Sequence, residues 1–452
     1  MSDLSPLGAR TVELLGELVR NACVNDLTPA SGHEHRSADT LEALFEGLPV
    51  RMRRIEPAPG RTTLVVALDG SDPAAEPLTL IGHTDVVPAD DSQWAHEPFA
   101  ARIDSDGVMW GRGTVDMLHL TAAMAVVTQD LARRVAEGGA RPAGTLTFVA
   151  AADEEARGGL GVPWIGEAEP QAIPWRNCIS EMGGGHIRGA RGSDSIAVVV
   201  GEKGAAQRRL HVDGDAGHGS VPLGRHSAVE VLARVVQRLA SARWPAGGGG
   251  EWEGFVSAFE FDPATRAALL AADYDGDYHE FGDLAAYTHA VSHVTVAQTV
   301  ARSGGPINVM PSHATLELDI RTLPGVDDDD VDAAIAAALG DLAEHVTIER
   351  LLSEAATASS IDTDLYRVIE AALTQRYPGT RVVPVFFPGG SDLRVARRLG
   401  GIGYGFGAVD SGASLGQVYS QLHAHDEHIA LADVRATAEV LHEVVTSYLT
   451  DV

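Results

Sequence analysis

The sequence predicts an α/β fold, in which a mainly parallel sheet covered by helices is interrupted by a smaller inserted α+β domain. Over residues 1–200, short apolar runs alternate with helices, an order typical of parallel sheets covered on both faces. After about Val200 the runs become alternating, half-exposed strands, and the first pattern returns from about Ile361. We therefore expect a discontinuous main domain, residues 1–200 and 353–452, and an inserted domain, residues 201–352.

The elements of the main domain follow from the spacing of apolar residues. Pro6–Ala22 carries an apolar stripe at helical spacing, and Met117–Ala136 is a buried helix rich in Ala, Leu, Met and Val that ends at Gly138-Gly139. Short apolar runs bounded by glycine or acidic turns predict strands. These strands are Thr62–Leu68, Leu78–Ile81, Thr145–Ala151, Asn177–Ile179, Val382–Phe387 and Ile402–Phe406, and a last helix begins at Leu431.

The inserted domain is predicted to be a small α+β sandwich. Its strands are Arg208–Val212, Ser292–Val300 and Ala314–Ile320, and its helices are Ala228–Leu239 and Asp327–His345. The acidic first turn of the second helix complements the helix dipole. The stretch Trp244–Ala290, which contains four consecutive glycines and a polar aromatic run, has no predicted assignment.

Composition limits the classes of protein to consider. The chain has 452 residues, 45% of them hydrophobic, enough for two or three domains at roughly 100–200 residues each. The net charge of −29 favours solubility and argues against a nucleic-acid partner, whose phosphates it would repel. Cys23 and Cys178 are too few for a disulfide framework. Without a signal-like start or ~20 consecutive apolar residues, we expect a soluble, cytoplasmic protein with no membrane partner.

Five groups of acidic and histidine residues are the candidate functional residues. Four of them follow a predicted strand, and open α/β sheets gather ligands at the carboxyl ends of their strands. Two histidines and three carboxylates make a mixed nitrogen and oxygen donor set suited to Zn²⁺ or a similar divalent ion. The groups are His83-Thr84-Asp85, Asp116 after Gly111-Arg112-Gly113-Thr114-Val115, Asp153-Glu154-Glu155, Glu181 before Gly183-Gly184-Gly185, and His423-Ala424-His425-Asp426-Glu427.

Each of the first three groups also has an ordinary structural explanation. On extended backbone Asp85 points the same way as His83 and could receive the second ring N–H of a metal-bound imidazole, but the two could also be a polar loop pair. Asp116 could cap the following helix. The adjacent Glu154 and Glu155 could lie in solvent, or one could bind metal while the other reaches a bound water.

The last two groups leave similar alternatives. Glu181 precedes glycines that would let the backbone approach a ligand closely, although a plain turn explains them too. His425 is an alternative ligand to His423, Glu427 is a possible orienting partner, and the histidine could be an ordinary loop residue.

Taken together, in this order and spacing, the motifs resemble the di-zinc aminoacylase, carboxypeptidase and dipeptidase superfamily, which includes acetylornithine deacetylase and succinyl-diaminopimelate desuccinylase. The resemblance covers nearly the full length. The insertion contributes Gly201-Glu202-Lys203-Gly204, Gly217-His218-Gly219-Ser220-Val221-Pro222, Asn308-Val309-Met310-Pro311 and Asp319-Ile320-Arg321. His226-Ser227-Ala228 departs from the Asn-Ala of many relatives. The resemblance implies a zinc-peptidase catalytic domain, an inserted lid and dimerisation domain, and a homodimer.

The resemblance also implies a role for each metal-site residue. Asp116 would bridge two divalent ions, with Zn²⁺ expected and Co²⁺ or Mn²⁺ as alternatives. His83 and Glu181 would complete one ion, and Glu155 and His423 the other. Glu154 would be the general base that activates a metal-bridging water, with Asp85 as a further catalytic residue beside His83.

Substrate contacts are implied in the same way. His218 would reach a partner subunit's active site and donate a hydrogen bond to the oxyanion. Asn308 and Arg321 would hold the substrate, and Arg321 suits a carboxylate because its guanidinium binds bidentately, although a salt bridge between domains would also explain it. Gly390 and Ser391 would offer backbone donors near the substrate carboxylate.

The function predicted from these residues is metal-dependent hydrolysis of an amide bond in a small substrate with a free carboxylate. A dipeptidase, a carboxypeptidase or an N-acyl-amino-acid deacylase would fit. One alternative keeps the metals but cleaves a ureido or carbamoyl group. A non-catalytic binding or assembly protein is a further alternative, and the presence of all five ligands and Glu154 argues against it.

Overall fold

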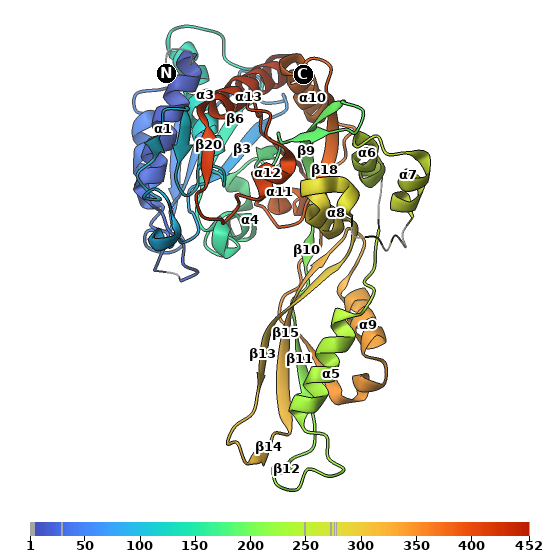
Figure 1. Cartoon of the computed structure of the whole chain (residues 1–452). Helices are drawn as coiled ribbons and strands as arrows, with labels where there is room; N and C mark the ends of the chain where they lie inside the picture. The colour runs from blue at the N-terminus through green and yellow to red at the C-terminus, as the bar shows by residue number, and fades with distance from the viewer. Residues whose placement is uncertain are drawn as a thin grey trace.

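The larger part of the protein is built around a ten-stranded sheet (Figure 1). The structure is a computed structural model that describes residues 5–28, 30–247, 250–271, 274, 276 and 278–451. The strand order is β1-β2-β6-β3-β7-β19-β9-β17, with β8 and β18 also paired to β9. The strands are β1 Arg51–Ile55, β2 Thr63–Leu68, β3 Leu78–His83, β6 Leu146–Ala151, β7 Asn177–Ser180, β8 His186–Arg188, β9 Asp194–Glu202, β17 Thr357–Ala358, β18 Arg381–Phe387 and β19 Ile402–Gly405.

The direction of the strands changes across this sheet. The central strands β6, β3, β7 and β19 run parallel, whereas β1 and β2 at one edge are antiparallel to their neighbours. On the other side β9 is parallel to β18 and antiparallel to β8, β17 and β19. The predicted α/β fold is confirmed, and its sheet is mixed, with a parallel centre.

Helices cover both faces of the large sheet, because successive strand residues point to opposite faces. In β2, Leu64 and Val66 pack with the helices on one face, and Val65 packs on the other. The first face carries α1 Pro6–Asn21, α2 His35–Leu44, α3 Leu118–Ala136, α10 Asp364–Arg376 and α13 Leu431–Asp451. The second carries α4 Val162–Ala168 and α11 Leu393–Arg398. Within the described residues, no helix is long and apolar enough to cross a membrane.

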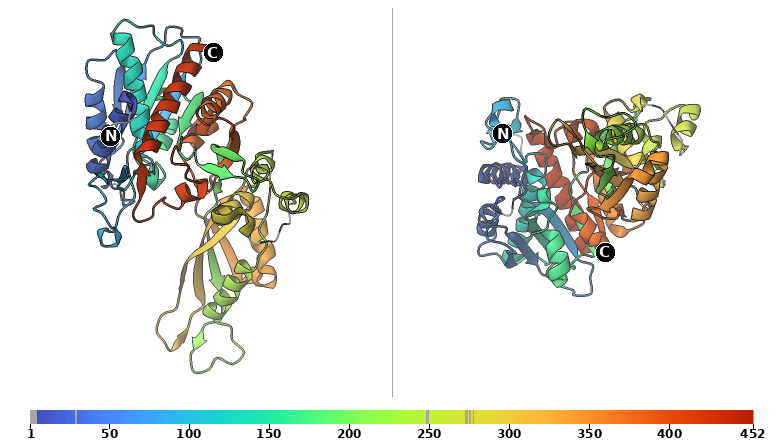
Figure 2. Two further views of the ribbon diagram at one scale, coloured as in Figure 1. Left: turned by 45° about the horizontal axis from the view of Figure 1, so that its top comes forward. Right: turned by 90° about the horizontal axis from the view of Figure 1, so that it is seen from below.

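A second, five-stranded antiparallel sheet extends away from the larger part (Figures 1 and 2). Its strands are β10 Gly204–Ala205, β11 Arg208–Asp213, β13 Thr295–Ser303, β15 His313–Thr322 and β16 Val346–Arg350. Helices α5 Ala228–Ala240 and α9 Asp328–Leu339 pack on this sheet through a separate apolar core. Asp327 caps α9 in a capping box with Asp330. At the far end of this part, β12 Gly217–His218 pairs with β14 Val309–Met310.

The stretch without a predicted assignment is mainly helical in its described residues. It contains α6 Gly250–Ala258, α7 Pro263–Leu270, the 3₁₀ segment His279–Leu284 and α8 Ala285–Ser292. Their aromatic residues pack with β9 and β18 of the large sheet. The domain boundaries at residues 201 and 352 stay a prediction, and these helices, although numbered inside the insertion, share a core with the main sheet.

A small three-stranded sheet connects two loops that matter for the site. It consists of β4 Arg102–Ile103, β5 Val108–Trp110 and β20 His428–Ala430, with β5 in the middle. Because β5 and β20 are paired, the loop after Trp110 and the loop before His428 lie against each other. Helix α12, Leu415–Tyr419, precedes the second loop.

Candidate active site

The five predicted metal ligands converge at one edge of the large sheet. His83 is the last residue of β3, Glu155 lies in the turn that follows β6, and Glu181 follows β7. These three strands are parallel neighbours, so their carboxyl ends meet at the same edge. Asp116 precedes α3, and His423 lies in the loop before β20.

Asp116 lies between the two histidines. Its Oδ1 is 3.2 Å from His83 Nε2 and its Oδ2 is 3.3 Å from His423 Nε2. Glu181 Oε2 lies 3.5 Å from the same nitrogen of His83, and Glu155 Oε2 lies 3.1 Å from that of His423. Each oxygen of Asp116 therefore faces a different histidine and carboxylate pair, the arrangement expected of a bridging ligand.

The donor set fits divalent metal ions. One ligand atom each from His83, Asp116 and Glu155 lie within 4.8 Å of one another, as do atoms from His83, Glu154 and Glu181. Imidazole nitrogens and carboxylate oxygens are the donors that Zn²⁺ takes in catalytic sites. Glu181 Oε2 is buried and has no hydrogen-bond partner among the described residues, which leaves it available as a ligand.

The electrostatics of the site also favour the binding of cations. Burial raises the pKa of Glu155 to about 7 and that of Glu181 to about 8, and the charge of Asp116 adds to both shifts. Burial, followed by the charge of Glu181, raises the pKa of Glu154 well above its usual range. Buried carboxylates this close repel one another, and cations between them would remove that repulsion.

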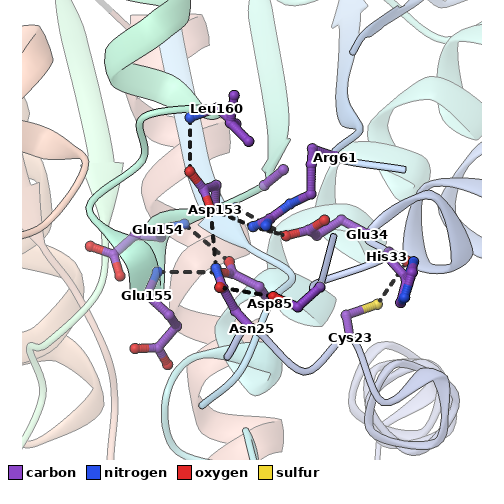
Figure 3. A network of polar contacts seen from close by, with 12 residues as sticks. Cys23, Asn25, His33, Glu34, Arg61, Asp85, Asp153, Glu154, Glu155 and Leu160 are labelled. Atoms are coloured by element: carbon purple, nitrogen blue, oxygen red, sulfur yellow. Dashed lines mark hydrogen bonds and ion pairs between the residues drawn. The ribbon is translucent and has the colours of Figure 1, made fainter. Parts of the chain in front are cut away.

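Asp85 has a different role from the predicted one (Figure 3). His83 Nδ1 donates to the main-chain oxygen of Asp85 at 2.9 Å, and the nearer carboxylate oxygen is 3.7 Å away. The carboxylate instead accepts the main-chain N–H groups of Glu154 and Glu155 and the side-chain amide of Asn25. Asp85 thus holds the turn that carries both glutamates, and the carbonyl bond leaves His83 Nε2 with its lone pair facing the site.

Glu427 also has a different partner from the predicted one. It is fully buried and accepts the main-chain N–H groups of Gly113, Val115 and Asp116, at 3.0, 2.7 and 3.1 Å, together with Arg112 Nη1 at 2.8 Å. Glu427 therefore shapes the loop that presents Asp116, and Arg112, which it binds, also donates to the main-chain oxygen of His423 at 3.4 Å. His425, the alternative ligand, is exposed as His423 is, but it is the ring of His423 that lies beside Asp116 and Glu155.

A buried ion network supports the turn from behind, and sequence reasoning missed two of its members. Arg61 lies between Glu34 and Asp153 (Figure 3), and all three side chains are buried. Asp153, with a left-handed φ of 66°, also accepts the N–H of Leu160. In Figure 3 the carboxylates of Glu154 and Glu155 point away from this network. Neither Arg61 nor Glu34 lies in a recognisable motif, so no signal in the sequence identifies them.

Four of the metal-site residues and Glu154 line a cavity of about 230 Å³ that also has a basic end; the four are Asp116, Glu155, Glu181 and His423. Arg321 and Gly390 line this cavity, as predicted for substrate contacts. The structure adds residues that the sequence did not single out, Arg157, Arg394 and Arg398. The cavity is therefore acidic where the predicted ligands gather and basic on the side of the lid and the glycine loop.

Two motif residues that had no predicted role hold this basic end together. Glu202 Oε2 accepts both the N–H and the hydroxyl of Ser391, so these donors, predicted to meet substrate, are bound within the chain. Lys203 donates to two main-chain carbonyls and one hydroxyl of residues 290–295. Both residues lie where the large sheet joins the smaller one.

His218 and Asn308 do not reach the site of their own chain. Both are exposed and belong to the distal loops around β12 and β14 (Figure 1). His218 Nδ1 is engaged by Ser220, and Asn308 meets the same loop through its main chain. Within one chain, the structure brings together the metal-site residues, Glu154, Asp85, Arg321 and Gly390, and leaves these two apart.

Comparisons with known proteins identify a family and several relatives. Residues 79–447 match the family model described as Peptidase family M20/M25/M40. The chain is 26% identical over 451 residues to succinyl-diaminopimelate desuccinylase of Caulobacter sp. (strain K31), covering 98% of this chain and 97% of that protein. It is also 26% identical over 370 residues to probable carboxypeptidase S-like 2 of Dictyostelium discoideum, covering 74% of this chain but only 64% of that protein.

The fold has solved counterparts. The M20 family metallo-carboxypeptidase Sso-CP2 from Sulfolobus solfataricus superposes with a TM-score of 0.72 at 19% identity, covering 97% of this chain and 99% of that one. At this identity the likeness establishes the shared fold.

Proposed function

Because the chain belongs to peptidase family M20/M25/M40 and is a metallohydrolase, we propose that it hydrolyses an amide bond in a small substrate with a free carboxylate. The observation that carries the proposal is the convergence around Asp116 of two histidines and two further carboxylates, with Glu154 beside them, in a cavity whose other end is basic. The acidic end suits the metals and the reaction, and the basic end suits a carboxylate.

Two divalent ions are proposed to share Asp116. His83 and Glu181 would hold one ion, and Glu155 and His423 the other, in agreement with the pairs that each Asp116 oxygen faces. When bound, such ions can lower the pKa of water towards about 7 and polarise a carbonyl. Zn²⁺ matches the donor set, and the choice among Zn²⁺, Co²⁺ and Mn²⁺ is part of the proposal.

Glu154 is proposed as the general base. Its main-chain N–H is fixed by Asp85 at 3.2 Å, and its side chain lines the cavity beside the ligands. As a carboxylate there, Glu154 can take up a proton on a side-chain oxygen and then pass it to the leaving amine. Glu155, the next residue, is directed at His423 and is proposed to serve as a ligand.

The substrate carboxylate is proposed to bind at the basic end. Arg321 presents a guanidinium oriented by two bonds to Asp319, at 3.0 and 3.1 Å. Arg394 is buried and held by the carbonyls of Ser391 and Arg157. A carboxylate between these cations would receive charge-assisted hydrogen bonds, with the N–H of Gly390 as a further donor.

His218 and Asn308 are proposed to act in the site of a second subunit. Their distance from the site of their own chain, together with the fully exposed Leu223 and Ile307 in the same distal loops, supports a homodimer that covers this end. In it, His218 would donate to the oxyanion formed at the partner's site.

The proposed function is tested by reconstitution of the metal-free protein. Chelator-treated enzyme is supplied with Zn²⁺, Co²⁺ or Mn²⁺ and assayed on a panel of dipeptides, N-acyl-amino acids and N-carbamoyl-amino acids. We expect metal-restored cleavage of amide substrates with a free carboxylate, and loss of cleavage when that carboxylate is amidated. Release of ammonia and carbon dioxide only from the carbamoyl compounds would replace the amide assignment, and no metal-restored cleavage of any compound would overturn the proposal.

A further inference from the structure

A second cavity of about 230 Å³ adjoins the site on the other side of Glu181 and Met182, which line both cavities. It is enclosed by the start of α3, the loop after β19, helix α12 and strand β20. The two cavities therefore share Glu181, a proposed metal ligand, as a wall residue. A substrate whose reacting carbonyl lies at Glu181 would extend one of its halves into each cavity.

The second cavity has a mainly apolar lining. Val115, Leu120, Phe406 and Ile429 are buried side chains of its wall, and Val418 of α12 closes it from the partly exposed side. None of the described residues that line it is an arginine or a lysine. This is the opposite of the first cavity, whose basic end includes Arg321 and Arg394.

The polar groups of this wall are largely bound within the protein. Thr437 Oγ1 donates to the carbonyl of Ala408 at 3.0 Å and accepts the N–H of the same residue. Asp433 accepts both the N–H and the hydroxyl of Ser411 at 2.7 Å. Among the described lining residues, His119 Nδ1 and Glu181 Oε2 are the buried side-chain atoms without a hydrogen-bond partner. A charged group entering the cavity would therefore lose most of its hydration without replacement.

The two histidines that line the second cavity, His119 and His428, do not provide a positive charge for a ligand either. Burial lowers the pKa of His119 to about 4, so its ring is neutral near pH 7. His428 stacks on Trp110 with ring centroids 4.4 Å apart, and its Nδ1 donates to the carbonyl of Asp426. A carboxylate in this cavity would face Asp433 without a compensating arginine or lysine among the described lining residues.

We propose that this cavity receives the acyl half of the substrate, and that this acyl group is apolar and uncharged. The basic end of the first cavity then takes the carboxylate of the amino acid that leaves. The substrate class is N-acyl-amino acids with an aliphatic or aromatic acyl chain, in preference to N-succinyl compounds, whose acyl group carries a carboxylate. The inference rests on the proposed function, because it places the two halves on either side of the bond that is cleaved.

The experiment narrows the cavity and follows chain-length preference. Val418→Phe fills the cavity from α12, and Ala430→Leu does so from β20 if the first variant folds poorly. Ile361→Phe, at an exposed position outside the cavity, is the matched control. For the acetyl, butanoyl, hexanoyl, benzoyl and succinyl derivatives of one amino acid, kcat/KM is measured with the metal-loaded enzyme, and thermal unfolding checks each fold.

We expect the unmodified protein to prefer hexanoyl to succinyl by about tenfold or more, a discrimination that one apolar pocket can supply. Val418→Phe should lower kcat/KM for hexanoyl and benzoyl by about tenfold while acetyl stays within about twofold, and Ile361→Phe should change neither. Preference for succinyl in the unmodified protein, or an unchanged chain-length profile in a folded narrowing variant, would overturn the inference.

A binding measurement separates this inference from the proposed function. Hexanoate and succinate are titrated into the metal-loaded protein by calorimetry, which needs no turnover. If no amide is cleaved but hexanoate binds and Val418→Phe abolishes its binding, the cavity assignment stands and the proposed function fails. Suppose instead that amides are cleaved, but Val418→Phe changes neither the binding of the two acids nor the chain-length preference in kcat/KM. The proposed function then stands and the cavity assignment fails.

Discussion

Glu154 and Glu155 show how neighbouring residues of one type obtain different roles. They are consecutive, and Asp85 binds the N–H of each. Their side chains nevertheless diverge, because Glu155 Oε2 lies 3.1 Å from His423 whereas Glu154 groups with His83 and Glu181. The turn thus directs two consecutive residues to different places, Glu155 as a proposed ligand and Glu154 as the proposed base.

Replacement of Glu154 by Gln tests the base. The amide keeps the size of the side chain but cannot take up the proton, so we expect kcat to fall by about 100- to 10,000-fold. Metal content by mass spectrometry should be unchanged, because Glu154 is not among the five proposed ligands. Glu167→Gln, at an exposed position of α4, is the control. Turnover comparable with that of the control would remove Glu154 from this role.

Replacement of Glu427 by Gln tests the support of the Asp116 loop. The carboxylate accepts three main-chain N–H groups and Arg112, and an amide would present N–H donors to some of them. We expect a loss of about 2–4 kcal/mol in the free energy of unfolding and metal affinity about 10- to 100-fold weaker. Urea unfolding and zinc titration measure the two effects. Unchanged metal affinity in the folded variant would show that Glu427 has no part in placing Asp116.

At the residue scale, the motifs predicted which side chains gather but not what holds them. His83, Asp116, Glu155, Glu181 and His423 could be named because strand exits and the family motifs mark them. The partners of Asp85 and Glu427 could not be named, because they depend on where loops meet. A carboxylate flanked by motif residues gives no indication of which distant N–H groups it accepts.

Elements far apart in the chain are tied together behind the site by one buried guanidinium. Arg61 precedes β2, Glu34 directly precedes α2, and Asp153 follows β6. Arg61 Nη2 lies 2.8 Å from Glu34 Oε1 and also contacts Asp153. The end of β6, and with it the turn of Glu154 and Glu155, is therefore anchored to the first helices.

Replacement of Arg61 by Met tests this anchor. It would leave two buried carboxylates without their cation, and we expect a loss of about 3–5 kcal/mol in the free energy of unfolding. Arg51→Met removes an exposed pair with Asp69 and should cost only about 0–1 kcal/mol. Denaturant unfolding of both variants makes the comparison. Equal costs for the two substitutions would contradict the structural importance of the buried network.

At the element scale, periodicity was most informative where packing is regular. The predicted helix Pro6–Ala22 is found as Pro6–Asn21, and the predicted strand Thr62–Leu68 as Thr63–Leu68. The direction of each strand was harder to predict from the sequence, because an apolar run has the same pattern in both directions. The antiparallel edges of the sheet depend on how the chain connects the strands. The helices of 250–292 had no predicted assignment because their aromatic residues pack against β9 and β18. These strands lie far away in the sequence, so the local pattern does not reveal the contact.

On the scale of the whole molecule, the metal-site residues and the proposed oxyanion donor are separated. The metal-site residues lie at the edge of the large sheet, and His218 lies at the far end of the smaller one (Figures 1 and 2). The family, the α/β fold and the enzyme class are confirmed. The homodimer, the cytoplasmic location and the identity of the metal stay predictions, because oligomers, compartments and ions leave no direct pattern in one chain.

Subunit mixing tests the proposed exchange of His218. Glu154→Gln and His218→Ala should each be nearly inactive alone. In a mixed dimer, one site would combine an intact Glu154 with an intact His218 from the partner, so random mixing should restore about one quarter of the original activity. Activity is measured after the two variants are mixed and allowed to exchange subunits. No recovery, with mixed dimers demonstrated by mass spectrometry, would show that each chain uses its own His218.

The metal content of the purified protein tests the centre most directly. It is measured by mass spectrometry for the unmodified chain and for Asp116→Ala, after both are saturated with Zn²⁺ and freed of excess ion. Because Asp116 faces both histidine and carboxylate pairs, we expect about two ions per chain in the unmodified protein and close to none in the variant. Two ions retained by a folded Asp116→Ala protein, or none bound by the unmodified one, would contradict the shared metal centre.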